Sequence, residues 1–264
     1  MATTSSHDSR ERRLAMCLRS VKRKLQQRLL PLRMYLGRKI MCVEQRKIVQ
    51  ISRTQLVKGP CSEQELQAMQ YAASHTSVPV PGIHRIYRLR QGLFIAMDYI
   101  HGESLQHVWP RLTDAEKAQT VGQVWDSLNL LHARRPPSSL GPITAASIGG
   151  GPVRDGALHL GECGPQDMGP FLSSADFATV VADRECVAGF DLEPAEVAFV
   201  HADICPRNII RGHDGKLWFI DWEFAGWWPT YWERVKWEFA DFPSMPDFVA
   251  LLNKEAAKTY GLPN

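Results

Sequence analysis

One short segment of the chain holds His201, Asp203, Asn208 and Asp221. Carboxylate and amide oxygens are the ligands that Mg²⁺ prefers, and a carboxylate can also accept the proton of a hydroxyl group. Phosphoryl transfer needs both, because its catalysis consists mostly of positioning and of neutralising charge. The residue types and their spacing therefore indicate a site that could move a phosphoryl group.

A β-hairpin is expected to bring these residues together. Two apolar runs, at 209–210 and 217–220, flank a Gly-His-Asp-Gly turn, and this arrangement is typical of a hairpin. The hairpin would place Asn208 and Asp221 at the same end, beside Asp203. The alternative is an exposed polar turn with a capped loop, but the four spaced positions together favour a site.

The pattern H-x-D-x-x-x-x-N, with I-D ending thirteen residues after the Asn, resembles the catalytic and metal-binding loops of the kinase-like superfamily. The ending D-W-E, with Glu223 where protein kinases carry Gly, is similar to the aminoglycoside phosphotransferase family, most of all to its branch common in fungi. This resemblance implies that Asp203 is the catalytic base and that His201 braces its loop. It also implies that Asn208 and Asp221 hold Mg²⁺.

The segment VKGPCSEQEL resembles the family's nucleotide-binding lobe. Lys58 ends an apolar run, and Ser62 precedes a predicted helix with Glu65 in the capping-box position. The resemblance implies that Lys58 neutralises phosphates of ATP (or GTP) and that Glu65 orients Lys58 through an ion pair. Glu63 is a rival partner. The alternative is a surface lysine and a glutamate that only caps the helix.

The segment AMDYIHGESL resembles the family's inter-lobe linker. The backbone of residues 97–100, which includes Met97 and Tyr99, would then bind adenine. Two departures from the kinase pattern stand out. No G-x-G-x-x-G precedes the strand lysine, where Gly37 is the single glycine, so the phosphate-covering loop must differ. Ala202 also replaces the Gly that usually stands between His and Asp.

The net charge of +3 hides an asymmetry. Residues 1–40 carry 11 of the 31 Lys/Arg and 2 of the 28 Asp/Glu, which leaves 20 basic and 26 acidic residues in the remainder. Six scattered cysteines without C-x-x-C spacing disfavour a zinc site and indicate reduced thiols, so we expect a cytoplasmic protein. No run of 18 apolar residues exists, so we expect no membrane span. We expect no nucleic-acid partner, and the oligomeric state is not predicted.

Residues 11–34 are predicted to form a basic amphipathic helix that Pro31 bends or ends. Packing on the small lobe is favoured over binding to a membrane surface, because charge runs are usually solvated faces. Asp8 and Glu11 count against a targeting segment. The predicted apolar stripe consists of Leu14, Leu18, Val21, Leu25 and Leu29.

The remaining elements follow the order of a kinase: strands, one helix, more strands, then helices. Six of the eight tryptophans cluster between 218 and 237, and we expect them to build a core rather than a cage for a quaternary ammonium ligand. Glu223, Glu233 and Asp241 could meet a cationic acceptor, although isolated acids on helices are usually solvated. Predicted strands span 39–43, 47–51, 55–58, 83–89 and 93–99; predicted helices span 62–74, 113–132 and 172–187; and residues 134–170 form a binding loop or lid.

We therefore expect a two-lobed, protein-kinase-like α+β fold. Residues 1–34 form a basic tail and helix, 35–100 a nucleotide-binding N-lobe, and 101–264 a C-lobe with the catalytic and metal-binding loops. The expected activity is transfer of the γ-phosphoryl group of ATP (or GTP), with Mg²⁺, to a hydroxyl of a small molecule. The alternatives are a choline, ethanolamine or homoserine kinase, and a pseudokinase that acts as a binding module. The missing A-P-E motif argues against a protein kinase.

Overall fold

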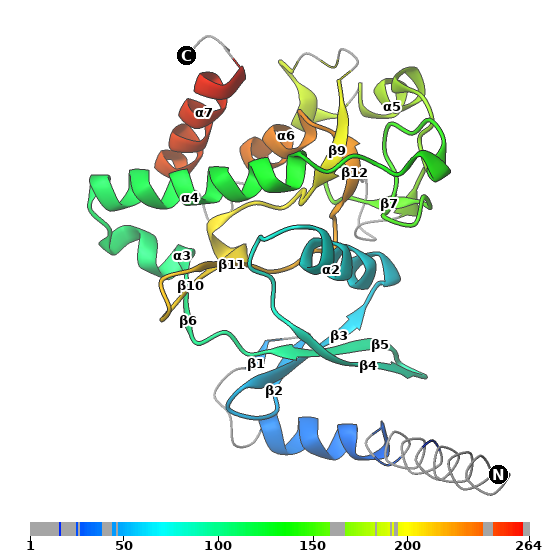
Figure 1. Ribbon diagram of the computed structural model, residues 1–264, viewed down its shortest axis with the longest axis vertical. Coiled ribbons are helices and arrows are strands. Elements are labelled where there is room, and N and C mark those ends of the chain that lie inside the picture. The colour runs from blue at the N-terminus through cyan, green and yellow to red at the C-terminus, as the bar shows by residue number, and fades with distance from the viewer. Residues whose placement is uncertain are drawn as a thin grey trace, which may run out of the picture. The chain divides into compact units, whose positions relative to one another are not determined.

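The structure, a computed structural model, contains two compact units (Figure 1). The smaller unit is Met1–Pro60 with His84–Tyr99, and the larger is Cys61–Ile83 with Ile100–Asn264. The predicted domain limits at 34 and 100 stay predictions. The structure describes residues 16, 25, 27–38, 44–45, 47–158, 167–182, 184–190, 192, 195–239 and 245–260.

The smaller unit is built on a five-stranded sheet with the strand order β1-β2-β3-β5-β4. β1 pairs with β2 and β2 with β3 in antiparallel fashion, and Ile48 lies opposite Lys58. Four of the five predicted strands are confirmed, and the predicted strand at 39–43 lies outside the described residues. The strands are β1 Glu44–Gln45, β2 Ile48–Gln50, β3 Gln55–Cys61, β4 Ile83–Leu89 and β5 Gly92–Asp98.

A helix over residues 27–38 packs on this sheet. Leu30 is fully buried in a core cluster that also contains Val57 and Tyr87. Gly37 lies so close to β2 that an added Cβ would come within 2.3 Å of the Gln50 carbonyl oxygen, so only glycine fits there. Packing on the small lobe is therefore confirmed for one face of this helix.

Two details of that helix differ from the prediction. The helix continues through Pro31 to residue 38, because burial of Leu30 and Met34 against the sheet offsets the lost proline hydrogen bond. Leu25 and Leu29, predicted to be covered, are 55% and 40% exposed. The other members of the predicted stripe, at 14, 18 and 21, lie outside the described residues.

The larger unit is mainly helical. The long helix α4 packs against α7, where the Trp125 indole donates to the Thr259 hydroxyl (3.0 Å) (Figure 1). Ser62 caps α2 by accepting from the Glu65 amide, and Thr113 and Glu116 form a capping box at α4, as expected from their types and spacing. The helices are α2 Glu63–His75, α3 Leu105–Val108, α4 Asp114–His132, α5 Ser174–Val181, α6 Trp232–Phe239 and α7 Pro246–Tyr260.

Three small sheets complete this unit. They have the strand orders β11-β10-β6, β12-β9 and β7-β8. The strands are β6 Gly102–Ser104, β7 Val153–Arg154, β8 Asp167–Met168, β9 Val197–Val200, β10 Ile209–Gly212, β11 Leu217–Phe219 and β12 Gly226–Pro229. Among the described residues, no helix combines the length and apolar character needed to cross a membrane.

Five of the six clustered tryptophans form core, as predicted, and Trp218 in β11 is half-buried. Trp222, Trp227, Trp228 and Trp232 have no exposed surface. Trp228 and Trp232 stack with ring centroids 5.3 Å apart. Rings buried in this way cannot surround a ligand, so the choline-cage alternative loses its structural basis.

The described part of the 134–170 connection is packed rather than open. Ala145 pairs with Phe171 and Ala146 with Trp227 in isolated β-bridges. Asp155 forms a buried ion pair with Lys236 (2.6 Å). Movement as a lid stays a prediction, and residues 159–166 lie outside the described part. The helix predicted at 172–187 is shorter, because Ser173 caps it at Ser174 and it ends at Val181.

Candidate active site

The candidate site lies where the buried strand β9 ends in the larger unit. All four residues of β9 are apolar, and the strand pairs with β12, with Phe199 opposite Trp227. The short 3-10 helix η4 (Pro206–Asn208) then leads into β10. Two apolar, hydrogen-bonded strands thus hold the polar loop between them, which includes Asp203.

Asp203 is buried and tightly held. Arg207 Nη2 donates to both carboxylate oxygens (3.0 and 3.2 Å), and Asn208 Nδ2 donates to Oδ2 (2.6 Å). Charge-assisted bonds of this kind are short and directional, so they fix the position of the carboxylate. Among these contacts Oδ1 accepts one bond and Oδ2 accepts two. Oδ1 can therefore accept a further hydrogen bond, for example from a hydroxyl group.

Asn208 and Asp221 meet through the predicted hairpin, which is confirmed. β10 and β11 pair antiparallel with Ile209 opposite Phe219, and the Ile220 amide donates to the Asn208 carbonyl (3.0 Å). The side-chain nitrogen of Asn208 donates to Asp203, so its amide oxygen is the atom that can face a cation. Asp221 follows with φ of 65°, a left-handed conformation that the paired strands must stabilise.

These donors fit a hard cation. Asn208 supplies an amide oxygen and Asp221 a carboxylate. Mg²⁺ sites that also bind phosphates need few protein ligands, because water and phosphate oxygens complete the shell. Among the described residues, no group of three or more His, Cys, Asp or Glu could hold a metal ion. Asn208 and Asp221 thus suit a cation whose remaining ligands are water and phosphate oxygens.

His201 ties the loop to the hairpin. It is fully buried, its Nε2 lies 3.2 Å from the Ile220 carbonyl, and its ring packs on Trp222 at 4.5 Å. Burial lowers the pKa of His201 below its ordinary value, despite the nearby acids Glu233 and Asp203. A neutral ring that donates to a carbonyl is a brace and not a proton acceptor. This agrees with the role the sequence implies, which stays a prediction.

Glu233 is the principal residue that the sequence misses. It was considered for a cationic acceptor, but it has no exposed surface and lies beneath the loop. Its carboxylate accepts from the amides of His201 and Ala202 (both 2.9 Å). Ala202 has φ of 60°, which a non-glycine residue adopts only when its surroundings enforce it. Glu233 supplies that enforcement from α6.

Of the two other acids considered for a cationic acceptor, only Glu223 is among the described residues. Asp241 lies outside the described residues. Glu223 is half-buried and lies two residues after Asp221. Arg207 is a second residue that sequence reasoning missed, although its position four residues after Asp203 allows an ion pair and could have revealed it.

The predicted nucleotide-binding residues are divided between the units. Lys58 in β3 and Met97 in β5 are buried in the smaller unit. Tyr99 is half-buried, and its amide donates to the Thr54 carbonyl (2.9 Å). Glu65, only 2% exposed, belongs to the larger unit. The ion pair between Lys58 and Glu65 therefore stays a prediction.

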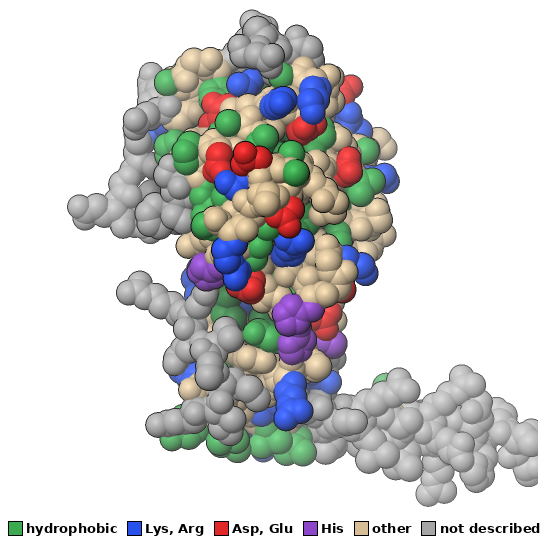
Figure 2. All heavy atoms as spheres, turned by 90° about the vertical axis from the view of Figure 1, so that its left-hand side faces the viewer, with side chains coloured by type: hydrophobic (Ala, Val, Ile, Leu, Met, Phe, Trp, Pro, Cys, Tyr) green, Lys and Arg blue, Asp and Glu red, His purple; other side chains and the backbone are tan. Residues whose placement is uncertain are grey.

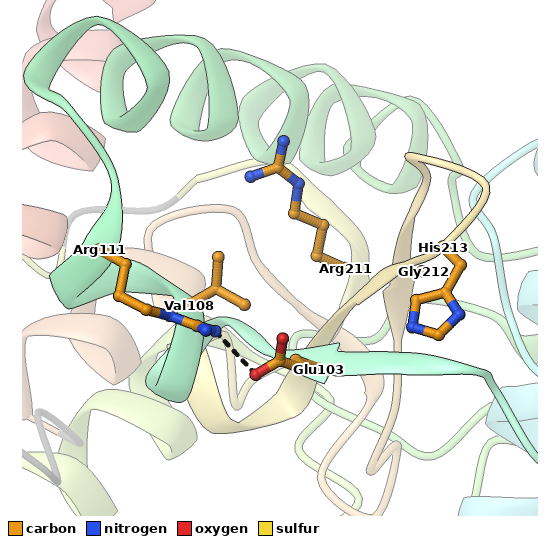
Figure 3. A pocket seen from close by; sticks show the side chains of 6 residues that line it. All are labelled: Glu103, Val108, Arg111, Arg211, Gly212 and His213. Carbon is orange, nitrogen blue, oxygen red and sulfur yellow. Dashed lines mark hydrogen bonds and ion pairs between the residues drawn. The ribbon is translucent and has the colours of Figure 1, made fainter.

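A separate pocket of about 370 Å³ opens in the larger unit (Figure 3). Arg111 and Glu103 form an ion pair there (2.7 Å), and Arg211 and His213 come from β10 and the turn after it. Asp203 does not line this pocket, nor does either predicted metal ligand. We therefore assign this pocket no part in the chemistry.

Comparison with known proteins identifies a family for the chain. The model of the phosphotransferase enzyme family matches residues 42–233. In sequence, no curated protein matches the chain significantly.

Solved structures resemble the fold. Apo aminoglycoside phosphotransferase APH(4)-Ia, as a thermostable mutant, is 16% identical with a TM-score of 0.53, over 81% of this chain and 75% of that chain. A ternary complex of such a mutant with ADP and hygromycin B is 15% identical with a TM-score of 0.53, over 86% and 82%. The type VIII aminoglycoside-3'-phosphotransferase is 11% identical with a TM-score of 0.50, over 82% of each chain. The predicted kinase-like α+β fold is confirmed.

Proposed function

The chain belongs to the phosphotransferase enzyme family, and we propose that it moves the γ-phosphoryl group of ATP, or of GTP, to a hydroxyl of a small molecule. The observation that carries this proposal is the hydrogen-bonded cluster of Asp203, Arg207 and Asn208 at the hairpin that ends in Asp221. An acceptor of the aminoglycoside type is the first candidate. Hygromycin B and ADP occupy one structure of similar fold.

In the proposed reaction one bond to phosphorus forms and one breaks. The acceptor hydroxyl oxygen forms a bond to the γ-phosphorus, and the bond from that phosphorus to the β–γ bridging oxygen breaks. The hydroxyl proton passes to Asp203 Oδ1, and the nucleoside diphosphate leaves with the electron pair of the broken bond. Arg207 and Asn208 hold the carboxylate in place for this transfer.

Magnesium would be held by the Asn208 amide oxygen and the Asp221 carboxylate. Bound there, it would neutralise charge on the phosphate oxygens. The protein contributes position: the Ile220–Asn208 backbone bond fixes the two ligands relative to each other, and His201 links this end of the hairpin to the loop. We propose that Lys58 neutralises phosphates of the nucleotide, that Glu65 orients Lys58 through an ion pair, and that the linker backbone at Met97 and Tyr99 binds the base.

The finer parts of the proposal rest on sequence. The branch common in fungi is proposed from the D-W-E ending, and a cytoplasmic location from the scattered cysteines. Among the described residues, Cys61, Cys186 and Cys205 are free cysteines.

The proposal is tested by an acceptor screen. Labelled ATP or GTP with Mg²⁺ is incubated with the protein and with hydroxyl-bearing metabolites and aminoglycosides, and labelled product is identified by mass spectrometry. We expect at least one acceptor to be labelled, and none when Mg²⁺ is chelated. Binding of Mg²⁺-ATP without transfer to any acceptor would favour the pseudokinase alternative instead.

A further inference from the structure

The helix over residues 27–38 has two apolar faces, and only one is covered. Leu30, fully buried, and Met34 face the core of the smaller unit. On the other side Leu25, Leu29, Leu32 and Leu36 are 55%, 40%, 52% and 44% exposed. In Figure 2 hydrophobic side chains gather along the edge of the molecule where this helix lies.

The exposed leucines form one stripe, named here the leucine stripe. They are spaced by four, three and four residues, which on an α-helix places them in a single row. At 100° per residue, Arg28 and Arg33 lie about 70° to either side of the centre of this row, and Met34 lies nearly opposite. Arg28 is exposed and Arg33 is half-buried. The helix packs on the sheet by one face, and its other face presents a row of leucines flanked by two arginines to solvent.

The surrounding sequence is uniformly basic. Residues 12–43 contain ten Lys or Arg and no Asp or Glu. A surface that covers the leucine stripe must therefore accept apolar side chains and supply negative charge at their margins. The headgroup layer of an anionic bilayer does both, because leucines enter the acyl boundary while arginines extend to the phosphates.

We propose that the leucine stripe docks this protein on the surface of an anionic lipid bilayer. The helix lies in the plane of the interface and does not span the membrane. Its opposite face stays on the sheet through Leu30 and the close approach of Gly37 to β2. The leucines are therefore already arranged before binding, which limits the entropy lost on contact.

A second copy of the chain is the less suitable occupant. Pairing two leucine stripes would bring together two segments of ten basic residues each, with no acidic residue between 12 and 43 to compensate. Like charges at such close range oppose association. The same charge that opposes self-pairing attracts the helix to anionic lipid.

Vesicle sedimentation of the full chain tests the proposal. The probes are vesicles of phosphatidylcholine alone and of phosphatidylcholine mixed with phosphatidylserine. We expect sedimentation with the mixed vesicles only, and a decrease at high salt, because screening shortens the reach of the arginine charges.

Three variants separate the contribution of the leucine stripe to vesicle binding from that of the flanking arginines. Leu32→Glu should weaken vesicle binding by more than about tenfold, because it places a charge in the apolar row. Arg28→Gln with Arg33→Gln should weaken binding to the mixed vesicles by about tenfold or more and reduce its salt dependence. The control Leu172→Glu makes the same change at a leucine that is 58% exposed in the larger unit, and it should bind like the unmodified protein.

Melting curves of all variants should match the unmodified protein, since the changed side chains are not in the core. Three results would overturn the proposal: no sedimentation with mixed vesicles, binding equal with and without phosphatidylserine, or a Leu32→Glu variant that binds undiminished. Concentration-dependent dimers that Leu32→Glu abolishes, without vesicle binding, would assign the stripe to a second copy instead.

Discussion

Asn208 has two tasks in the proposed site. Its nitrogen donates to the Asp203 carboxylate (2.6 Å), and its oxygen is proposed to bind a cation next to Asp221. In this proposal the position of Asp203 and metal binding are coupled, because a displaced Asn208 would disturb both. The residue types and spacing predict this proximity correctly. The donor that completes the cluster, Arg207, was missed because the motif treats its position as variable.

At this scale the metal ligands give the first prediction. Asp221→Ala should weaken Mg²⁺-dependent ATP binding by more than about tenfold, since a lost oxygen ligand cannot be replaced by a methyl group. Isothermal titration with and without Mg²⁺ measures the affinity of the variant for ATP. Asp214→Asn, in the exposed turn of the same hairpin, is the matched control and should bind normally. Equal Mg²⁺-ATP affinity in Asp221→Ala would remove Asp221 from the metal site.

Cys205 gives a pH-dependent prediction. Burial, with a smaller contribution from Asp203, raises the pKa of this thiol to about 12. The reactive thiolate is therefore scarce at pH values below that pKa, and alkylation by iodoacetamide at pH 8 should be much slower than at the half-buried Cys61. Mass spectrometry of timed samples reports both rates. Equal labelling of the two thiols in the folded protein would contradict the buried position of Cys205.

At the scale of elements, α6 controls the loop that carries Asp203. Glu233 lies thirty residues after Asp203 and accepts two backbone hydrogen bonds that keep Ala202 in its left-handed conformation. From sequence, an isolated acid on a helix is expected to be solvated, because no local pattern reveals a contact between distant elements. The hairpin, by contrast, was predictable, because its turn and strands are adjacent in sequence.

Glu233→Ala should therefore destabilise the protein by at least about 2 kcal/mol, since it leaves two buried amides without an acceptor. Glu238→Ala, on the same helix, removes an ion pair with Arg234 (2.8 Å) and should cost at most about 0.5 kcal/mol. Denaturant unfolding of both variants measures the difference. Similar unfolding midpoints for the two variants would show that the hydrogen bonds from the His201 and Ala202 amides to Glu233 do not contribute to stability. A lower turnover of Glu233→Ala is also expected, because the loop would lose its fixed backbone.

The N-terminal helix shows where sequence reasoning fails at this scale. Pro31 was expected to bend or end it, but the helix continues, because tertiary packing of Leu30 outweighs the local preference of proline. The leucine pattern predicted one apolar face. The structure has two, and which leucines are covered depends on the sheet against which the helix packs.

At the scale of the whole molecule, the chain divides into a unit built on a five-stranded sheet and a mainly helical unit. The order of strands and helices predicted this α+β fold, because each strand and helix carries its own periodicity, caps and turns. The division of residues between units could not be predicted as well. Residues 61–83, which include α2, belong to the larger unit by their contacts. Local sequence patterns do not predict contacts between segments that are distant in the chain.

The central claim is that Asp203 accepts the proton of an acceptor hydroxyl during phosphoryl transfer. The most direct measurement is transfer of labelled γ-phosphoryl from Mg²⁺-ATP (or Mg²⁺-GTP) to the best acceptor of the screen, with nucleotide affinity measured in parallel. For Asp203→Asn, which keeps the shape of the side chain, we predict turnover reduced by about 10²–10⁴-fold at nearly unchanged nucleotide affinity. Unchanged turnover in Asp203→Asn, or no acceptor labelled by the unmodified protein, would contradict the claim.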